Sequence, residues 1–453
     1  MKNGKTDMLE GALLPRIILF ALPILASSYL QQFFNSVDSA VVGRFAGPEA
    51  LAAVGGNGPV INLLINFFSG LSLGANVIVA RLIGEKDEDG VRKAVPTVML
   101  VAVFSGIILT VVGFILSTPL LRLVGSPVEI LPLASLYLKI YFAGMPFFMV
   151  FNFGSAVLRS NGDTERPLYA LAAAGVVNVI LNLIFVIFFH MGVVGVGVAT
   201  VVSNVISASL VLRMLLQTDS VIRLDLKDLV FERSIFRQVA AIGFPASLQG
   251  MIFSLSNATI LSAVNSFGSY AVAGSAASIN YENFSYFVVN AFAQSTVTFT
   301  SQNYGAGKQE RCKKVFLVSL FTSIGVHCVL AWGMVFFQKP LLSIFTTDPT
   351  AMDYAVRRMT ILLVLHPLMS TYEVSGSALR GLGKSLYPAL ITMVCCCGVR
   401  LLWVFFILPL HRTWEFLFLV YPISWILAGT FVTSVYLYQR KKLFKEKTSS
   451  LSE

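Results

Sequence analysis

The sequence predicts an all-α polytopic membrane protein with about twelve transmembrane helices in two six-helix bundles. Three observations lead to this prediction. The 453 residues are 56% hydrophobic and only 12% charged, whereas soluble domains carry roughly 25% charged residues. Apolar stretches of about 20 residues, the length that crosses a bilayer as a helix, recur along the whole chain. The second half also repeats positions of the first, as in duplicated membrane folds.

Each expected helix is an apolar stretch bounded by polar or charged residues. In the first half these stretches cover residues 16–42, 51–83, 93–117, 131–159, 166–190 and 193–216. In the second half they cover residues 235–266, 270–303, 315–338, 352–380, 386–409 and 414–438. A transmembrane β-barrel would alternate apolar and polar residues with period two. The apolar run 98–115 does not alternate, so helices are expected.

An offset of 221 residues aligns the two halves. The matched pairs include Pro119 with Pro340, Pro146 with Pro367, Pro167 with Pro388, and Arg159 with Arg380. By chance, about 0.5 matched proline pairs would be expected for the prolines of residues 1–220. Because six helices return the chain to its starting side, we expect a parallel repeat with a pseudo-twofold axis along the membrane normal. The expected lobes are residues 1–220 and 221–453, with a cytoplasmic linker at 217–234.

Lysine and arginine gather in one set of connections. They cluster between the second and third expected helices, between the sixth and seventh, between the eighth and ninth, and after the last. The positive-inside rule then places both termini of this expected multi-pass membrane protein in the cytoplasm. The net charge of +10 is therefore a topology signal with some contact to anionic headgroups, and no nucleic-acid partner is expected.

Motifs for catalysis and metal binding are weak. Residues 70–74 fit G-x-S-x-G, the pattern of a catalytic nucleophile turn, but they lie within an apolar helix. The same glycines match G-x-x-x-G, the pattern of close helix–helix contact. The four histidines lack the spacing of a metal site, and no P-loop is present. We therefore expect no enzyme activity, no metal centre and no cofactor.

Acids inside the expected helices point to function, because a carboxylate in hydrocarbon is costly and normally faces a wet cavity. Asp38 shares one helix face with Gln31 and Asn35, at the spacing i, i+4, i+7. Glu282 and Glu373 are the other candidates. The alternative for each is a structural acid whose charge is satisfied by its neighbours.

Cations and amides also lie inside the expected helices. Arg400 and Lys139 are the cations, and a buried guanidinium needs a counter-ion, for which Glu373 or Glu282 is a candidate. The amides are Asn178 and Asn182 in the fifth expected helix, and Asn57, Asn62, Asn66 and Asn76 in the second. Such amides either bridge helices or line a cavity.

Several short motifs carry a resemblance to a known family. They are VDS at 37–39, GPEALAAVG at 47–55, GLSLG at 70–74, ARLIG at 80–84, LRSNGDT at 158–164, QNYGAGK at 302–308 and LRGLG at 379–383. Together they resemble the multidrug and toxic compound extrusion (MATE) family of bacterial type, over essentially the whole chain. The resemblance implies a monomeric exporter of amphipathic organic cations that works by alternating access and is driven by H⁺ or Na⁺.

The resemblance extends unevenly to single residues. Asp38 matches the acid that bacterial members use for cation coupling, so the resemblance implies a coupling site of Asp38, Asn35, Asn178 and Asn182, with Na⁺ as one candidate ion. Asn182 stands where one branch of the family has an aspartate, which removes a titratable partner. Another branch carries a glutamate in the seventh helix, and residues 245–267 contain no acid.

The expected substrate cavity is assigned from the polar and aromatic residues of both halves. It comprises Gln31, Asn62, Asn66, Tyr281, Glu282, Tyr286, Glu373 and Arg400. Aromatic rings could receive a flat cation, although in a helix such rings more often pack against neighbours. The alternative function is a flippase for lipid-linked saccharides, which would need a cavity dominated by cations, and Arg400 and Lys139 weakly favour it.

Overall fold

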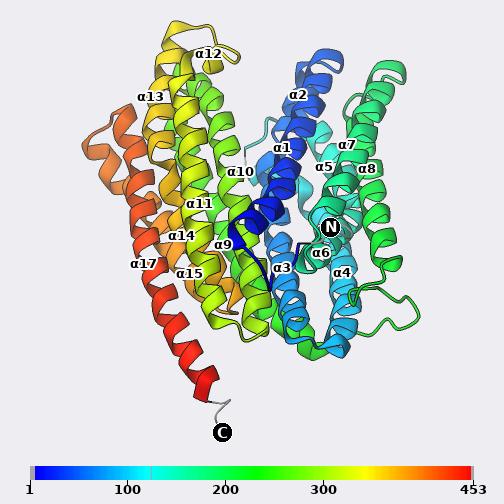
Figure 1. Ribbon diagram of the computed structural model, residues 1–453. Coiled ribbons are helices and arrows are strands. Elements are labelled where there is room, and N and C mark those ends of the chain that lie inside the picture. The colour runs from blue at the N-terminus through cyan, green and yellow to red at the C-terminus, as the bar shows by residue number, and fades with distance from the viewer. Residues whose placement is uncertain (1–5, 124, 450–453) are drawn as a thin grey trace. The chain divides into compact units, whose positions relative to one another are not determined.

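The computed structural model describes residues 6–123 and 125–449, which form helices and no strands (Figure 1). The first half contains α1 (Leu13–Phe45), α2 (Pro48–Gly55), α3 (Gly58–Glu85), α4 (Glu88–Leu123), α5 (Leu131–Ala143), α6 (Met145–Ser160), α7 (Glu165–Leu183) and α8 (Gly192–Leu216). The second half contains α9 (Arg233–Asn265), α10 (Ser269–Gly305), α11 (Gln309–Phe336), α12 (Gln338–Leu342), α13 (Pro349–Leu365), α14 (Met369–Gly381), α15 (Leu386–Thr392), α16 (Val399–Leu402) and α17 (Trp414–Ser449). The predicted all-α polytopic fold is confirmed.

Most of the expected membrane segments are long and apolar enough to span a bilayer. Within the described residues nine helices meet this condition, and the bent pair α5 and α6 makes a tenth. The remaining two expected segments form α10 and the α13–α14 pair. These helices carry Glu282, Arg358 and Glu373, so their lower hydropathy reflects the polar groups that the site analysis below describes.

Helix breaks occur at matched prolines in the two halves. Pro146 follows the 47° bend between α5 and α6, and Pro367 lies in the short 3₁₀ turn His366–Leu368 between α13 and α14. Proline removes one backbone donor and clashes with the preceding turn, so it ends or bends a helix at these places. The same pair of prolines was matched by the repeat in the sequence, and the structural breaks agree with it.

The chain divides into two compact units. The first contains Leu22–Ser247 with the residues before Met8, and the second contains Met8–Ala21 with the residues from Leu248 onward. Helices α1 and α9 therefore each contribute to both units. In the first unit α3 packs closely on the early part of α9, since a Cβ at Gly70 would lie 2.4 Å from the Ser247 nitrogen and one at Gly74 would lie 2.3 Å from the Val239 oxygen. The helix-contact reading of Gly70 and Gly74 is thus confirmed.

The second unit is centred on large buried side chains of α14 and α17. Tyr372, Trp425 and Tyr436 are fully buried there. Residues 8–21 join this unit through Phe20, whose ring meets Phe299 edge to face with centroids 5.5 Å apart. Arg311 adds backbone contacts, donating to the oxygens of Met8 at 3.1 Å and Gly11 at 2.9 Å.

Candidate functional site

Asp38 and two asparagines form a polar network within the first unit. The side-chain amide of Asn182 donates to the Asp38 carboxylate and to Asn178 Oδ1, the latter at 3.2 Å. Both asparagines are buried and Asp38 is half-buried. Asn178 and Asn182 lie one turn apart on α7, so both side chains face α1 from the same side. Three residues of the expected coupling site are therefore in one hydrogen-bonded chain.

A glycine on α7 allows α1 to come close to this network. A Cβ at Gly175 would lie 1.7 Å from Phe34 Cε2, so the Phe34 ring fills the space that any larger residue would occupy. Gly175 precedes Asn178 by one turn, and Phe34 precedes Asp38 by one turn. The ring-on-glycine contact thus sets the distance between the helices that carry the carboxylate and its amide donor.

Two tyrosines of α5 extend the network and were not predicted. Tyr137 and Tyr141 both interact electrostatically with Asp38, and their rings lie 6.1 Å apart. They are spaced i, i+4 in an apolar helix, a pattern that is equally typical of packing, so the sequence contained no distinguishing signal. The carboxylate thus accepts from an amide and lies within electrostatic range of two phenol groups, and both kinds of group can hydrogen-bond a charged or a neutral partner.

The other predicted polar residues of the first unit lie outside this hydrogen-bonded chain. Gln31, Asn35 and Asn62 are exposed, and Asn66 is half-buried. Asn57 and Asn76 bridge helices instead, donating to the backbone oxygens of Ala134 at 3.1 Å and Ala156 at 3.0 Å. The bridging alternative therefore holds for these two amides.

In the second unit Glu282 is engaged by Arg358. The guanidinium of Arg358 donates from Nε to Glu282 Oε1 at 2.7 Å and from Nη2 to Oε2 at 2.9 Å. Ser278 donates to the same carboxylate at 2.9 Å, and Ser275 accepts from Arg358. A paired and hydrogen-bonded carboxylate has few lone pairs left for a ligand. Arg358 was not among the candidate residues predicted from the sequence, so its role in this pair was missed.

The cation Arg400 has a different environment from the one considered in the sequence. Its Nη1 donates to Asn257 Oδ1 at 3.1 Å, and its guanidinium lies 4.3 Å from the ring centroid of Tyr421. The ion pairs within the described residues do not include Arg400, so neither Glu282 nor Glu373 is its direct partner. Aromatic and amide contacts therefore hold this guanidinium.

Glu373 and the tyrosines of α10 complete the predicted set. Half-buried Glu373 interacts electrostatically with Arg380 and with Tyr286, while Arg380 donates to Gln249 at 2.7 Å. Tyr281 is buried and donates its hydroxyl to the Leu341 oxygen at 2.6 Å. Tyr281 thus makes packing and hydrogen-bond contacts within its unit.

A histidine cluster is a further feature that the sequence did not reveal. Ser285 Oγ lies 2.6 Å from His327 Nε2 and 2.9 Å from His366 Nδ1, and the two ring nitrogens are 3.1 Å apart. The histidines are 39 residues apart on different elements, so no motif spacing links them. Over the described part of the chain, no group of three or more His, Cys, Asp or Glu side chains could hold a metal ion.

Comparison with known proteins agrees with the duplicated fold. The profile of the MatE family matches residues 23–184 and again residues 245–406, with starts 222 residues apart. The chain belongs to the MatE family. The two matches also confirm the internal repeat, and they make the chain a multi-pass membrane transporter of the MATE type.

Individual relatives span nearly the whole chain. "Probable multidrug resistance protein YoeA" of Bacillus subtilis is 27% identical, covering 94% of this chain and 93% of its own length. "FAD transporter" of Shewanella oneidensis is 28% identical, covering 95% and 96%. The structure "Crystal structure of MATE in the bent conformation" superposes with a TM-score of 0.88 at 22% identity, covering 98% of each chain. This structural likeness shows that the MATE fold is shared.

Proposed function

We propose that this protein is a secondary active multidrug exporter that exchanges H⁺ or Na⁺ for amphipathic organic cations by alternating access. The observation that carries the proposal is the Asp38–Asn182–Asn178 chain within the first unit. An acid in a membrane helix normally serves transport or proton transfer. Relatives named as multidrug resistance proteins support the class of cargo.

The exchange follows from one negative charge. When the coupling cation binds Asp38, the carboxylate is neutralised and no longer attracts a cationic drug. When the coupling cation leaves, the charge is available again, and the drug binds. The two ligands are therefore linked through their differential affinity for one group, and a gradient of the coupling ion drives drug export.

Asn182 is suited to both states of Asp38. Its amide nitrogen donates to the carboxylate, and its Oδ1 atom is buried with no hydrogen-bond donor among the described residues. Rotation of the amide by half a turn would offer Oδ1 to a protonated carboxyl. Hard cations prefer oxygen ligands, and we expect the same of Na⁺. Asn182 Oδ1, Asn178 Oδ1 and the Asp38 carboxylate would supply such ligands.

The test is transport in proteoliposomes with ethidium as the probe and either a pH or a Na⁺ gradient imposed. Asp38→Asn should reduce gradient-driven efflux to the rate of empty liposomes. Glu49→Gln, which removes an exposed acid of α2 in the same unit, should leave efflux unchanged. Efflux that survives in Asp38→Asn would refute the coupling role, and the gradient that drives the wild type identifies the ion.

A cargo that carries a diphosphate is the second candidate, as in a flippase for lipid-linked saccharides. It is favoured by Arg400, a buried cation that forms no ion pair with a described residue, and by the relative named "FAD transporter". Transport of FAD, measured in the same proteoliposomes as ethidium efflux, distinguishes the diphosphate cargo from the organic-cation cargo. If the proteoliposomes exchange radiolabelled FAD without an ion gradient, and if this exchange requires Arg400, the cargo is a diphosphate and the cation-export proposal is wrong.

We also propose the topology that accompanies this function. The protein acts as a monomer in the bacterial inner membrane, with both termini cytoplasmic. The predicted lobes 1–220 and 221–453 are its two moving parts, except that residues 221–247 move with the first lobe and residues 8–21 with the second, in keeping with the compact units. Alkaline phosphatase fused after Glu453 should be inactive in cells, because alkaline phosphatase folds only outside the cytoplasm. An active fusion would reverse the orientation.

A further inference from the structure

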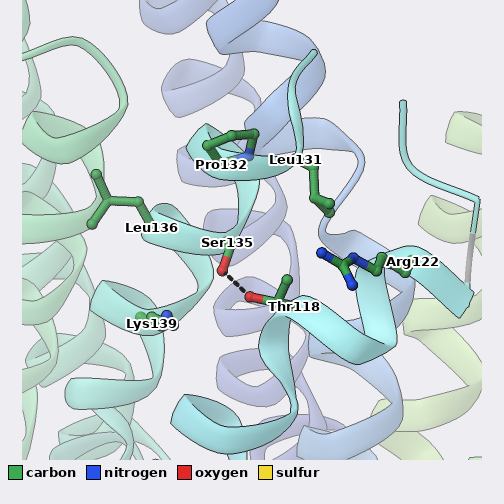
Figure 2. Close-up of a pocket in the computed structure, with 7 residues that line it drawn as sticks. All are labelled: Thr118, Arg122, Leu131, Pro132, Ser135, Leu136 and Lys139. Atoms are coloured by element: carbon green, nitrogen blue, oxygen red, sulfur yellow. Dashed lines mark hydrogen bonds between the residues drawn. The ribbon is translucent and has the colours of Figure 1, made fainter. Parts of the chain in front are cut away.

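A pocket of about 330 Å³ lies between the end of α4 and the beginning of α5, within the first unit. Figure 2 shows the side chains that line it, which come from these two helices. The lining consists of Thr118, Arg122, Leu131, Pro132, Ser135, Leu136 and Lys139. Neither the coupling network nor the proposed cargo site uses any of these residues.

The pocket is positively charged and contains no carboxylate. Arg122 and Lys139 lie on different helices, and neither side chain forms a hydrogen bond or an ion pair with a described residue. The nearest acid in the sequence, Glu129, is exposed and forms no ion pair with either cation. Two unneutralised cations on one pocket favour an anionic ligand.

Hydroxyl groups and apolar side chains complete the lining. Thr118 Oγ1 and Ser135 Oγ lie 2.6 Å apart in a hydrogen bond that joins α4 to α5, as the dashed line in Figure 2 marks. Either hydroxyl can also accept or donate to a bound oxygen. The ligand that matches this lining has phosphate-type oxygens next to an apolar portion.

The position of the pocket in the membrane decides between a dissolved anion and a lipid. Lys139 lies eight residues after Leu131, the first residue of α5, which is about 12 Å along a helix. The lysine stem can reach from that depth toward the headgroup level. Leu136, which lines the pocket, is 44% exposed, and Leu123, which follows Arg122 in the chain, is 83% exposed, so the surface next to the charges suits acyl chains.

We propose that Arg122 and Lys139 bind the phosphate group of an anionic phospholipid, with its acyl chains along the exposed leucines. The site lies at the membrane end opposite the basic connection that precedes α4. A net-anionic headgroup is preferred because a zwitterionic one brings its own ammonium group next to the two cations. Lipid binding here is independent of the transport cycle and of the identity of the coupling ion.

The test measures binding of phosphatidylglycerol to the purified full-length protein by native mass spectrometry, with phosphatidylcholine as the neutral comparison. Each charge near a bilayer surface contributes on the order of a fivefold change in affinity. Arg122→Gln and Lys139→Gln should each weaken phosphatidylglycerol binding about fivefold, and the double variant about 25-fold. The conservative variants Arg122→Lys and Lys139→Arg should keep binding near the wild-type level.

The matched control is Arg44→Gln with Lys339→Gln, which removes the same total charge from exposed positions outside the pocket. This control should bind phosphatidylglycerol as the wild type does. Equal binding of phosphatidylcholine, displacement of the lipid by millimolar inorganic phosphate, or an equal loss in the control would each overturn the proposal. Monodisperse elution of every variant in size-exclusion chromatography ensures that folded proteins are compared.

Discussion

Arg358 and Glu282 form a two-pronged ion pair within the second unit, with donor–acceptor distances of 2.7 and 2.9 Å. The arginine side chain is 4% exposed and the glutamate side chain 14%. The guanidinium also lies 4.7 Å from the ring centroid of Phe418. Both charges are therefore held within the fold, and Glu282 is better suited to joining α10 with α13 than to exchanging a proton.

Removal of one partner of this pair should be strongly destabilising. Arg358→Leu leaves an uncompensated carboxylate, and the expected loss is about 3–5 kcal/mol. The double variant Arg358→Leu with Glu282→Leu removes both charges, so it should recover most of the loss. Thermal unfolding in detergent measures the two variants side by side. A double variant that is no more stable than Arg358→Leu would contradict this account.

Loss of the Asn182 amide should impair coupling without unfolding the protein. In Asn182→Ala, Asp38 loses its donor, and a Na⁺ ion would lose one oxygen ligand. If Na⁺ is the coupling ion, its half-saturating concentration for ethidium efflux should rise about tenfold, the effect of roughly 1.4 kcal/mol. Gln217→Ala, which changes an exposed amide of the same unit outside the predicted sites, serves as the control. Unchanged Na⁺ dependence in a Na⁺-driven wild type would exclude Asn182 from the site.

Gly175 should be intolerant of any side chain. Gly175→Ala forces the Phe34 ring to move, because the new Cβ would lie 1.7 Å from Cε2, and overpacking of this kind costs about 1–3 kcal/mol. Gly55→Ala is the matched control, since nothing lies within 4 Å of its added Cβ. Melting temperature and ethidium efflux are the two measurements.

A second substitution tests whether the contact with the Phe34 ring causes the loss of stability in Gly175→Ala. Phe34→Leu in the Gly175→Ala background removes ring atoms from the contact, so stability and efflux should return toward the wild type. A non-additive recovery is expected for residues in direct contact. If the two changes add independently, the contact does not set the spacing of α1 and α7.

The serine between the two buried histidines should contribute to stability. Ser285→Ala removes the hydroxyl that lies within 2.9 Å of both rings, and a buried polar group without its partner costs about 1–3 kcal/mol. Ser343→Ala, an exposed serine of the same unit, should change stability little. Chemical unfolding in detergent compares them, and equal midpoints for the two variants would show that the cluster is not stabilising.

The fold could be predicted from the sequence because the features that indicate it are local or periodic. Apolar length predicted twelve membrane segments. Within the described residues ten of them are long and apolar enough to span a bilayer when α5 and α6 count as one, and α10 and α13–α14 are not among these ten. The matched prolines located breaks that recur in both halves, at Pro146 and at Pro367. Helix propensity, hydropathy and proline geometry act over a few residues, so they can be read from the order of residues.

The partners of the polar residues could not be read in the same way. Asp38 and Asn182 are 144 residues apart, Glu282 and Arg358 are 76 apart, and His327 and His366 are 39 apart. Helical periodicity reports only neighbours three or four residues away. The sequence therefore singled out Asp38 as an acid in an apolar helix, and it left the counter-ion of Arg400 open between Glu282 and Glu373.

Residue order determined the membrane class, the helical segments, the duplication and the family of this protein, because each depends on composition or on short-range pattern. Packing between helices decided that Glu282 belongs to Arg358, that Arg400 is held by an amide and aromatic rings, and that Asp38 meets Asn182. These contacts arise only when helices far apart in the chain are brought within hydrogen-bond distance, and the low dielectric between them makes the choice of partner energetically decisive.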